Sequence, residues 1–370
     1  MLAQEVSTVR KTALYDEHVA LGAKIVEFAG WAMPMFYSGI VGEHRRVRST
    51  AGVFDVSHMG EFIAHGPDAL AALERLTTNR LSAVEEGRVQ YSAMCYENGG
   101  FVDDLLIYAM PGRYMLVVNA ANKEKDLEWI RSNLEGDATV DDVSDETALI
   151  ALQGPESHGI LSGLTEADIA SLRYYRWIEA DVAGRRTTLS RTGYTGEYGF
   201  EIYCDPGDAP AIWSALMEAG SSVDLEPVGL GARDTLRLEM GFSLYGNEMD
   251  ENRTPAEAGL MWITKLEKGD FIGREAIAKH LEEGVRERIV GFELTGRGVP
   301  RPGHRILVGD EPVGHVTSGT FSPSLERGIG LGYVRSDIEG ELSIEIRDRK
   351  IEARTTSLPF YGEGSARLKR

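Results

Sequence analysis

The chain has 370 residues, more than one ordinary hydrophobic core accommodates, so we expect two or three domains. Hydrophobic residues make up 42% and charged residues 26% of it, a composition typical of globular proteins and not of disordered or membrane-embedded ones. The formal net charge of -19 argues against nucleic acid as the main partner, because phosphate binding needs a basic surface.

The N-terminal residues show no targeting pattern, since they lack an apolar core and carry Asp16 and Glu17. No stretch approaches the 18 uninterrupted apolar residues or so that a membrane-spanning helix needs, so no membrane association is expected. The two cysteines, Cys95 and Cys204, have neither metal-site nor disulfide spacing, and we expect two buried thiols in a reducing cytosol. The sequence therefore predicts a cytoplasmic protein.

In chain order, the first 280 residues mix helical and strand patterns. Residues 65–78 predict an amphipathic helix that begins after Asp68, and residues 105–119 predict a hairpin around Pro111 and Gly112. The patterns that follow are a helix after Asn119, a strand over 146–155, a glycine-rich turn region and short strand over 191–203, and a helix over 227–242 with Pro227 near its start.

From about residue 281 the pattern changes to short strands separated by Gly, Pro and Asp turns. Such dense strand spacing is typical of a small all-β barrel or sandwich. We therefore expect an α+β body over residues 1–280 and an all-β C-terminal domain over residues 281–370.

The segment GGFVDDLLIY places two adjacent carboxylates, Asp103 and Asp104, at the head of an apolar strand. Because side chains alternate along a strand, Asp104 shares a face with Leu106 and Tyr108, while Asp103 lies on the aliphatic face. A face that combines an acid, an aliphatic residue and a tyrosine suits the wall of a ligand pocket. The alternative, that both acids are solvated turn or capping residues, stays open at this point.

A second carboxylate, Glu201, alternates with the apolar residues of the strand over 198–203 and so points away from their face. Most such glutamates are simply solvated. The functional interpretation is a carboxylate that accepts paired hydrogen bonds from a planar donor edge such as a guanidinium or a pterin. Gly193, Gly196 and Gly199 either allow the backbone to approach a ligand closely or form turns.

Arg233 and Arg237 lie four residues apart and share one helix face. Ion pairs with Asp234 and Glu239 are one explanation for them, and an anionic ligand group is the other.

Several catalytic signatures are missing from the sequence. The glycines at 229–231 do not complete a dinucleotide fingerprint, and there is no Walker A loop, HExxH or GxSxG motif. His44 and His58 are isolated, and we expect them to be structural.

Many segments between residues 12 and 334 together resemble the glycine cleavage system T-proteins, a family of tetrahydrofolate-dependent aminomethyltransferases. The resemblance rests on the order and density of these segments rather than on any one of them. They are TALYDEHVALGAKIVEFAGWAMP, AGVFDVSHMGE, GGFVDDLLIY, VVNAANKEKDLEWI, ALQGPES, GYTGEYGFEIY, GLGARDTLRLEMGFSLYGNEMDE, FIGREA, TSGTFSPSL and GIGLGYV.

The resemblance implies a fold of three domains around a central folate cavity. The body over residues 1–280 would comprise two intertwined α+β domains, the second near residues 53–140, and the C-terminal domain over residues 281–370 would be a β-barrel. It also implies a reaction in which a lipoylated carrier protein, the H-protein, presents an aminomethyl group on its lipoyl sulfur. The one-carbon unit passes to the co-substrate tetrahydrofolate, giving 5,10-methylenetetrahydrofolate, ammonia and the reduced carrier, with no metal involved.

The resemblance also assigns site residues. The family's catalytic aspartate corresponds to Asp104, expected to orient the folate and to assist proton movement at the nitrogens that receive the carbon. Glu201 matches the pterin-binding carboxylate, and Arg233 matches an arginine of the folate site. Flat rings would bury the pterin and aminobenzoyl faces. The residues expected to line the folate cavity beside them are Tyr91, Tyr108, Asn119 and Tyr194.

Other proteins of this fold provide alternatives. One is a folate-dependent demethylase of a small sulfonium or amine substrate, and another is a non-catalytic folate-binding protein. A relative in iron–sulfur cluster assembly carries a Lys-Gly-Cys-Tyr signature, but residues 268–276 here read KGDFIGREA and contain no cysteine. Relatives fused to a flavin oxidase need an N-terminal dinucleotide fingerprint, which this sequence lacks.

Overall fold

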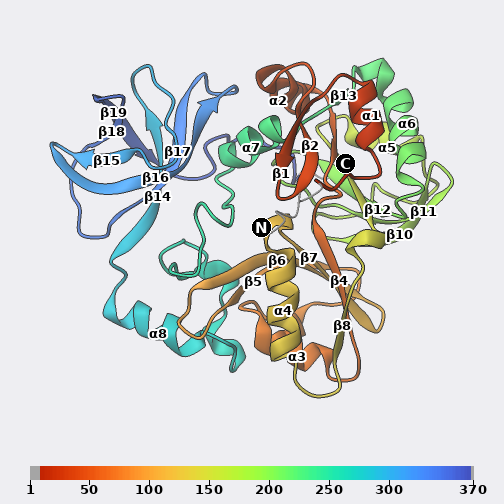
Figure 1. Cartoon of the computed structure of the whole chain (residues 1–370), viewed down its shortest axis with the longest axis horizontal. Coiled ribbons are helices and arrows are strands. Elements are labelled where there is room, and N and C mark those ends of the chain that lie inside the picture. Colours follow the sequence, from red (N-terminus) through yellow and green to blue (C-terminus); the bar gives the residue numbers. More distant parts are fainter. Residues whose placement is uncertain (1–8, 368–370) are drawn as a thin grey trace, which may run out of the picture.

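The structure is a computed structural model that describes residues 9–367. Two β-sheets with flanking helices form the body, and a closed β-barrel lies beside them (Figure 1). This mixture of helices and sheets with a C-terminal barrel confirms the fold class expected from the sequence. Within the described residues, no helix is long and apolar enough to cross a membrane.

A six-stranded sheet forms one half of the body. Its neighbouring strands run antiparallel, except for a short parallel pair at one edge. The sheet follows the order β10 (Trp177–Val182), β11 (Arg185–Ser190), β12 (Gly199–Cys204), β9 (Ala148–Gln153), β3 (Gly52–Asp55) and β13 (Glu226–Pro227).

One face of this sheet packs on helices α5 (Ser157–Ser162) and α6 (Ala209–Ala219) around the fully buried Trp213. Phe200 and Ile202 of β12 lie in this cluster. Tyr203 belongs instead to the core between the two sheets, as period-two alternation requires. The face of β12 that carries Glu201 therefore looks toward the centre of the molecule.

A five-stranded antiparallel sheet forms the other half of the body. The chain leaves the first sheet after β3 and returns to it with β9, so this second sheet is an insertion. Its strands follow the order β5 (Val89–Cys95), β6 (Phe101–Met110), β7 (Arg113–Val118), β4 (Gly60–His65) and β8 (Thr139–Asp142). Helices α3 (Ala69–Leu76) and α4 (Lys123–Asn133) cover its outer face (Figure 1).

Local predictions in this part of the chain are confirmed, with small corrections. The turn at Pro111 and Gly112 joins β6 and β7, and α4 follows Asn119 after one 3-10 turn. Asp68 does precede α3, but its side chain does not cap that helix and accepts instead the backbone N–H of Asp137 at 2.7 Å.

The N-terminal region and helix α7 complete the upper part of the body (Figure 1). Its elements are α1 (Tyr15–Ala20), the hairpin of β1 (Lys24–Phe28) and β2 (Trp31–Phe36), α2 (Ile40–Ser49) and α7 (Leu230–Glu239). Pro227 was expected near the start of the helix that corresponds to α7. It belongs instead to β13, because its extended backbone pairs with Val53.

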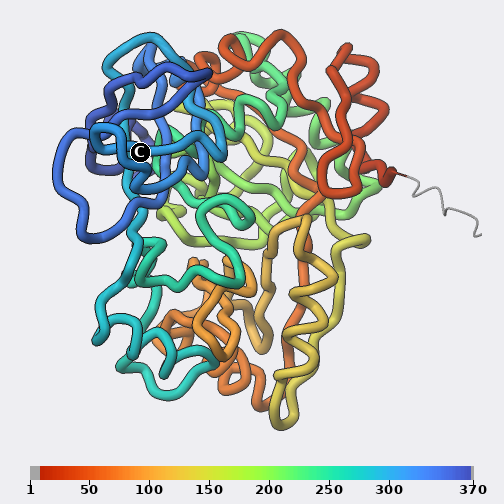
Figure 2. Tube along the Cα trace, turned by 60° about the vertical axis from the view of Figure 1, so that its left-hand side comes forward, coloured from red at the N-terminus to blue at the C-terminus, as the bar shows by residue number. Residues whose placement is uncertain are grey.

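The C-terminal strands close into a six-stranded barrel. The order around it is β14 (Glu287–Leu294), β17 (Arg327–Arg335), β16 (Glu311–Ser322), β15 (Arg305–Val308), β18 (Leu342–Ile346) and β19 (Arg349–Thr356). The segment that leads from α7 through α8 (Arg274–Glu283) to the barrel packs on the five-stranded sheet (Figure 2).

After the barrel the chain returns to the body. The backbone N–H of Tyr361 donates to Glu239, and that of Ala366 donates to Gly196, both at 3.0 Å. The domain bounds given above, 1–280 with a second unit near 53–140 and then 281–370, stay predictions.

A largely buried ion network joins these parts. Arg48 of α2 lies 2.8 Å from Glu197, in the turn before β12, and 3.0 Å from Glu239 at the end of α7. Glu239 also accepts hydrogen bonds from Ser322 and Ser324 of the barrel. One guanidinium therefore compensates two carboxylates that hold the body, the barrel and the returning chain end together.

Replacing this cation tests its importance for stability. Arg48→Met should lower the free energy of unfolding by about 3–5 kcal/mol, since it leaves two buried carboxylates without their counter-ion. Urea denaturation followed by circular dichroism measures the change. The matched control is Arg45→Met on the same helix, whose pair with Glu326 is solvent-exposed and should contribute little. Equal losses in the two variants would contradict the argument.

Candidate active site

A cavity of about 1860 Å³ lies at the centre of the molecule. Distant parts of the chain line it, among them Phe28 of β1, Tyr91 of β5, Glu201 of β12, Arg233 of α7 and Phe321 of β16. Both halves of the body and the barrel thus contribute to one site, as expected for a central cavity.

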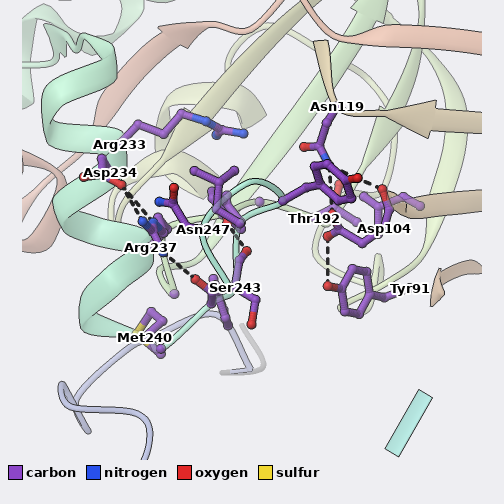
Figure 3. A pocket seen from close by; sticks show the side chains of 18 of the residues that line it. Tyr91, Asp104, Asn119, Thr192, Arg233, Asp234, Arg237, Met240, Ser243 and Asn247 are labelled. Atoms are coloured by element: carbon purple, nitrogen blue, oxygen red, sulfur yellow. Dashed lines mark hydrogen bonds and ion pairs between the residues drawn. The ribbon is translucent and has the colours of Figure 1, made fainter. Parts of the chain in front are cut away.

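Asp104 of β6 lies in the wall of this cavity, and both of its oxygens are held. Tyr91 donates from its hydroxyl to Oδ2 at 2.8 Å, and the Asn119 amide nitrogen donates to Oδ1 at 2.7 Å. Figure 3 shows these three side chains together on one side of the cavity. The structure thus brings together three of the residues that the family resemblance assigned to the site.

Asp103 lies behind the wall and is fully buried. Its Oδ1 accepts a hydrogen bond from the same Asn119 amide nitrogen at 2.8 Å, and its Oδ2 accepts the backbone N–H of Asn119 at 3.3 Å. The alternation of side chains along β6 thus separates the pair as expected, with only Asp104 facing the cavity. Neither acid is a solvated turn residue.

Burial is the main cause of an unusual pKa at Asp104. Together with the neighbouring charge of Asp103, it raises the pKa of Asp104 to about 7, against the opposing hydrogen bonds from Tyr91 and Asn119. A carboxyl group with this pKa can both hold and release a proton near neutral pH.

Glu201 faces the same cavity from β12. Thr192 donates a hydrogen bond to its Oε2, and no described residue donates to Oε1. Burial raises the pKa of Glu201, while Thr192 and the charge of Arg233 oppose that shift. One carboxylate oxygen thus stays available to a donor on a ligand.

Tyr108 does not line the cavity, contrary to expectation. It is fully buried in the core between the sheets, where its hydroxyl meets those of Tyr203 at 2.9 Å, Ser190 at 3.1 Å and Thr192 at 3.3 Å. The strand period gave its face correctly, but its hydroxyl meets that of Tyr203 of β12, and Tyr203 rather than Tyr108 lines the cavity. Tyr108 therefore supports the hydroxyl of Thr192, which in turn holds Glu201.

Arg233 reaches into the cavity from α7, opposite the Asp104 side (Figure 3). Its guanidinium makes no ion pair or hydrogen bond with the residues that the structure describes and lies 5.0 Å from the ring centre of Tyr194. Tyr194 also lines the cavity and stacks on Phe242 at 5.6 Å between ring centres. A guanidinium without a partner and a stacked aromatic pair thus line the same cavity as the free oxygen of Glu201.

Arg237 is structural, as the first of the two interpretations proposed. Its guanidinium donates to Asp234 at 2.8 Å and to Ser318 of the barrel at 2.8 Å, and it lies 3.3 Å from Glu248. The expected pairing with Glu239 is wrong, because that carboxylate is taken by Arg48. The two arginines of one helix face therefore differ in function.

His58 is a cavity residue that sequence reasoning missed. His44 is structural as expected, with hydrogen bonds to Thr235 at 2.7 Å and Ser324 at 3.1 Å. His58 instead lines the cavity, and burial together with the charge of Arg233 lowers its pKa to about 4, so its ring is neutral. The available signal was its position directly after β3, where the chain crosses between the two sheets.

The remaining chemistry-bearing residues are unremarkable in geometry. Cys95 and Cys204 are free, buried thiols, as expected. In the part of the chain that the structure describes, no group of three or more His, Cys, Asp or Glu side chains is arranged to hold a metal ion.

Family models match almost the whole chain. The model described as "GCVT N-terminal domain" matches residues 14–268, and the one described as "Glycine cleavage T-protein C-terminal barrel domain" matches residues 287–362.

Individual relatives match over comparable lengths. The chain is 49% identical to an aminomethyltransferase of Rubrobacter xylanophilus, covering 98% of this chain and 96% of that one. It is 48% identical to an aminomethyltransferase of Halothermothrix orenii, covering 95% and 100%. The crystal structure of glycine cleavage system aminomethyltransferase T from Bartonella henselae superposes with a TM-score of 0.88 at 34% identity, covering 96% and 99%. The chain belongs to the glycine cleavage T-protein family.

Proposed function

We propose that this chain is the aminomethyltransferase of a glycine cleavage system. It transfers the one-carbon unit of an aminomethylated lipoyl carrier protein to tetrahydrofolate and releases ammonia. The full-length similarity to relatives named aminomethyltransferase supports this reaction over the demethylase and the non-catalytic alternatives. The observation that carries it is Asp104, a carboxyl group with a pKa near neutrality, held by two donors in the wall of a large central cavity.

The donor and acceptor set of the cavity fits a reduced folate. The free oxygen of Glu201 suits the donor-rich edge of the pterin ring. The unpaired guanidinium of Arg233 suits polar or anionic groups of the folate. The stacked rings of Tyr194 and Phe242 offer a flat apolar surface. When bound, tetrahydrofolate supplies the nitrogens that accept the one-carbon unit.

Asp104 would then be the group that transfers the proton in the reaction. In its protonated form it can donate to the departing amine, and in its ionised form it stabilises positive charge that develops on the transferred carbon. Tyr91 and Asn119 fix the orientation of both oxygens, so little reorganisation is needed during the reaction.

The partner in this proposal is the lipoylated H-protein, in the cytoplasm. Apolar side chains that line the cavity and are also exposed to solvent support the approach of a protein-bound arm. They are Phe28, Val41, Trp262, Phe321 and Leu358.

A direct assay tests the reaction. The protein is mixed with aminomethylated carrier and tetrahydrofolate, and ammonia and 5,10-methylenetetrahydrofolate are measured. We expect equal amounts of the two products, with ammonia release accelerated by folate. Carrier without the aminomethyl group is the control. Ammonia release that does not respond to folate, or methylation of folate from a sulfonium donor without carrier, would refute the proposal.

The two neighbouring aspartates give a matched pair of variants. Asp104→Asn should reduce kcat by about 100-fold or more, because it removes the proton-transferring group that faces the cavity. Asp103→Asn should reduce kcat by less than about tenfold, since Asp103 has no contact with the cavity. Circular dichroism checks that both variants fold. If the two lose activity equally, Asp104 is not the catalytic carboxylate.

Folate affinity tests Glu201. Glu201→Gln should raise the Kd for tetrahydrofolate by about tenfold or more, since a charge-assisted hydrogen bond is lost. Isothermal titration calorimetry measures the change. Glu179→Gln on the exposed outer strand β10 is the control and should bind as the wild type does. An unchanged Kd for Glu201→Gln would remove this residue from the site.

A further inference from the structure

Five buried side chains with hydroxyl or carboxyl oxygens form a continuous hydrogen-bonded chain beside the cavity. The hydroxyl of Tyr203 lies 2.9 Å from that of Tyr108, which lies 3.1 Å from Oγ of Ser190. This Oγ lies 2.6 Å from Oγ1 of Thr192, which donates to Oε2 of Glu201. Each of the five is at most 6% exposed. Tyr203 and Glu201, at the two ends, line the cavity, whereas Tyr108 and Ser190 lie behind its wall.

The chain joins the two sheets of the body. Tyr108 belongs to β6 of the five-stranded sheet, and Ser190 is the last residue of β11 in the six-stranded sheet. Ser190 stands directly opposite Glu201 in the pairing of β11 with β12. The rings of Tyr108 and Tyr203 pack edge to face with 5.5 Å between their centres. Strand pairing and ring packing thus fix where the hydroxyls lie.

The number of available protons fixes the direction of each hydrogen bond. A hydroxyl has one proton to donate, and an ionised carboxylate can only accept. Thr192 gives its proton to Glu201, so Ser190 must donate to Thr192. The proton of Ser190 is then used, so Tyr108 donates to Ser190, and by the same reasoning Tyr203 donates to Tyr108. All four protons therefore point toward Glu201.

Both tyrosines keep their protons near neutral pH. Burial raises the pKa of Tyr108 and that of Tyr203, and the charge of Glu201 adds to both shifts. The two phenols therefore remain donors. Hydroxyls that are aligned in this way polarise one another, so the chain strengthens the last hydrogen bond beyond what the Thr192 hydroxyl provides alone.

We propose that Tyr108 and Ser190 are positioning residues for Glu201. Acting through Thr192, their hydroxyls hold Oε2 in place and leave Oε1, to which no described residue donates, for a donor on the bound folate. Two residues that do not line the cavity would then control the affinity for its ligand. The identity of that ligand rests on the proposed function, whereas the chain itself does not.

Infrared difference spectroscopy tests the chain without any substrate. The wild type minus Glu201→Gln spectrum, recorded at mildly alkaline pH, should show the bands of an ionised carboxylate. The same difference in a Tyr108→Phe background should show the antisymmetric carboxylate stretch shifted, although the Tyr108 hydroxyl bonds to other hydroxyls and not to this carboxylate. A band of a protonated acid in the wild type, or an unshifted band in the Tyr108→Phe background, would overturn the proposal.

Affinity for tetrahydrofolate tests the consequence. Tyr108→Phe should raise the Kd by about fivefold, the effect of one lost hydrogen bond. The kcat at saturating folate should change by less than about twofold, since the variant alters binding and leaves Asp104 in place. Thr192→Val should raise the Kd by about tenfold, and Thr192→Ser, which keeps the hydroxyl, should bind as the wild type does. Calorimetry and steady-state kinetics measure these changes.

Two buried hydroxyls elsewhere provide matched controls. Tyr333 of the barrel donates to the backbone carbonyl of Glu248, and Thr187 of β11 donates to that of Ala180, both at 2.7 Å. Both lie outside the cavity wall that the described residues form. Tyr333→Phe and Thr187→Val should therefore lower the stability, as the chain variants do, while the Kd for tetrahydrofolate stays unchanged.

The outcomes separate this inference from the proposed function. A Tyr108→Phe variant that folds and binds folate as the wild type does would overturn the inference alone. So would a Thr192→Ser variant that binds as weakly as Thr192→Val. A wild type that binds tetrahydrofolate but releases no ammonia would refute the proposed function alone. If the wild type bound no folate, the proposed function would fail, and the infrared result would still decide the inference.

Discussion

Buried charge at helix α7 is the constraint on which the rest of the molecule depends. A cavity of about 1860 Å³ removes packing from the centre, so the surrounding parts must be joined by other means. Arg237 and Glu239 of α7 join these parts. Arg237 is bound to Glu248 and to the barrel residue Ser318, and Glu239 is bound to Arg48 and to the barrel residue Ser322. Such pairs are directional, and they fix distances that an apolar contact would leave adjustable.

The same helix also carries Arg233, whose charge acts on one of the two buried carboxyl groups of the cavity. Burial raises the pKa of both Glu201 and Asp104. At Glu201 the hydrogen bond from Thr192 and the charge of Arg233 oppose this rise. At Asp104 the neighbouring negative charge of Asp103 adds to the rise, and the pKa reaches about 7. The two carboxyl groups of the cavity therefore differ in the charges that act on them, an arginine at Glu201 and an aspartate at Asp104.

The sequence predicted what local periodicity controls and missed what tertiary packing controls. Strand alternation separated Asp103 from Asp104 and placed Glu201 away from the apolar core, and both hold in the structure. It failed for Tyr108, since a period gives a face but cannot show that another strand covers that face. It also could not pair Arg237 with Glu248 or assign His58, because those contacts join segments that the sequence separates by loops of no fixed geometry. The site residues were named through the family resemblance, and periodicity supports only part of that list.

Asn119 shows where a single register decides the chemistry. The hairpin pairs Leu105 with Val118, so the next residue along β7 comes level with Asp104. Only there can one amide nitrogen reach both aspartates, at 2.7 and 2.8 Å. A slip of one residue would place an aliphatic side chain at this point and turn the amide to the other face. The two carboxyl groups would then lose their common donor while staying buried. The short turn at Pro111 and Gly112 therefore fixes which residue stands opposite Asp104.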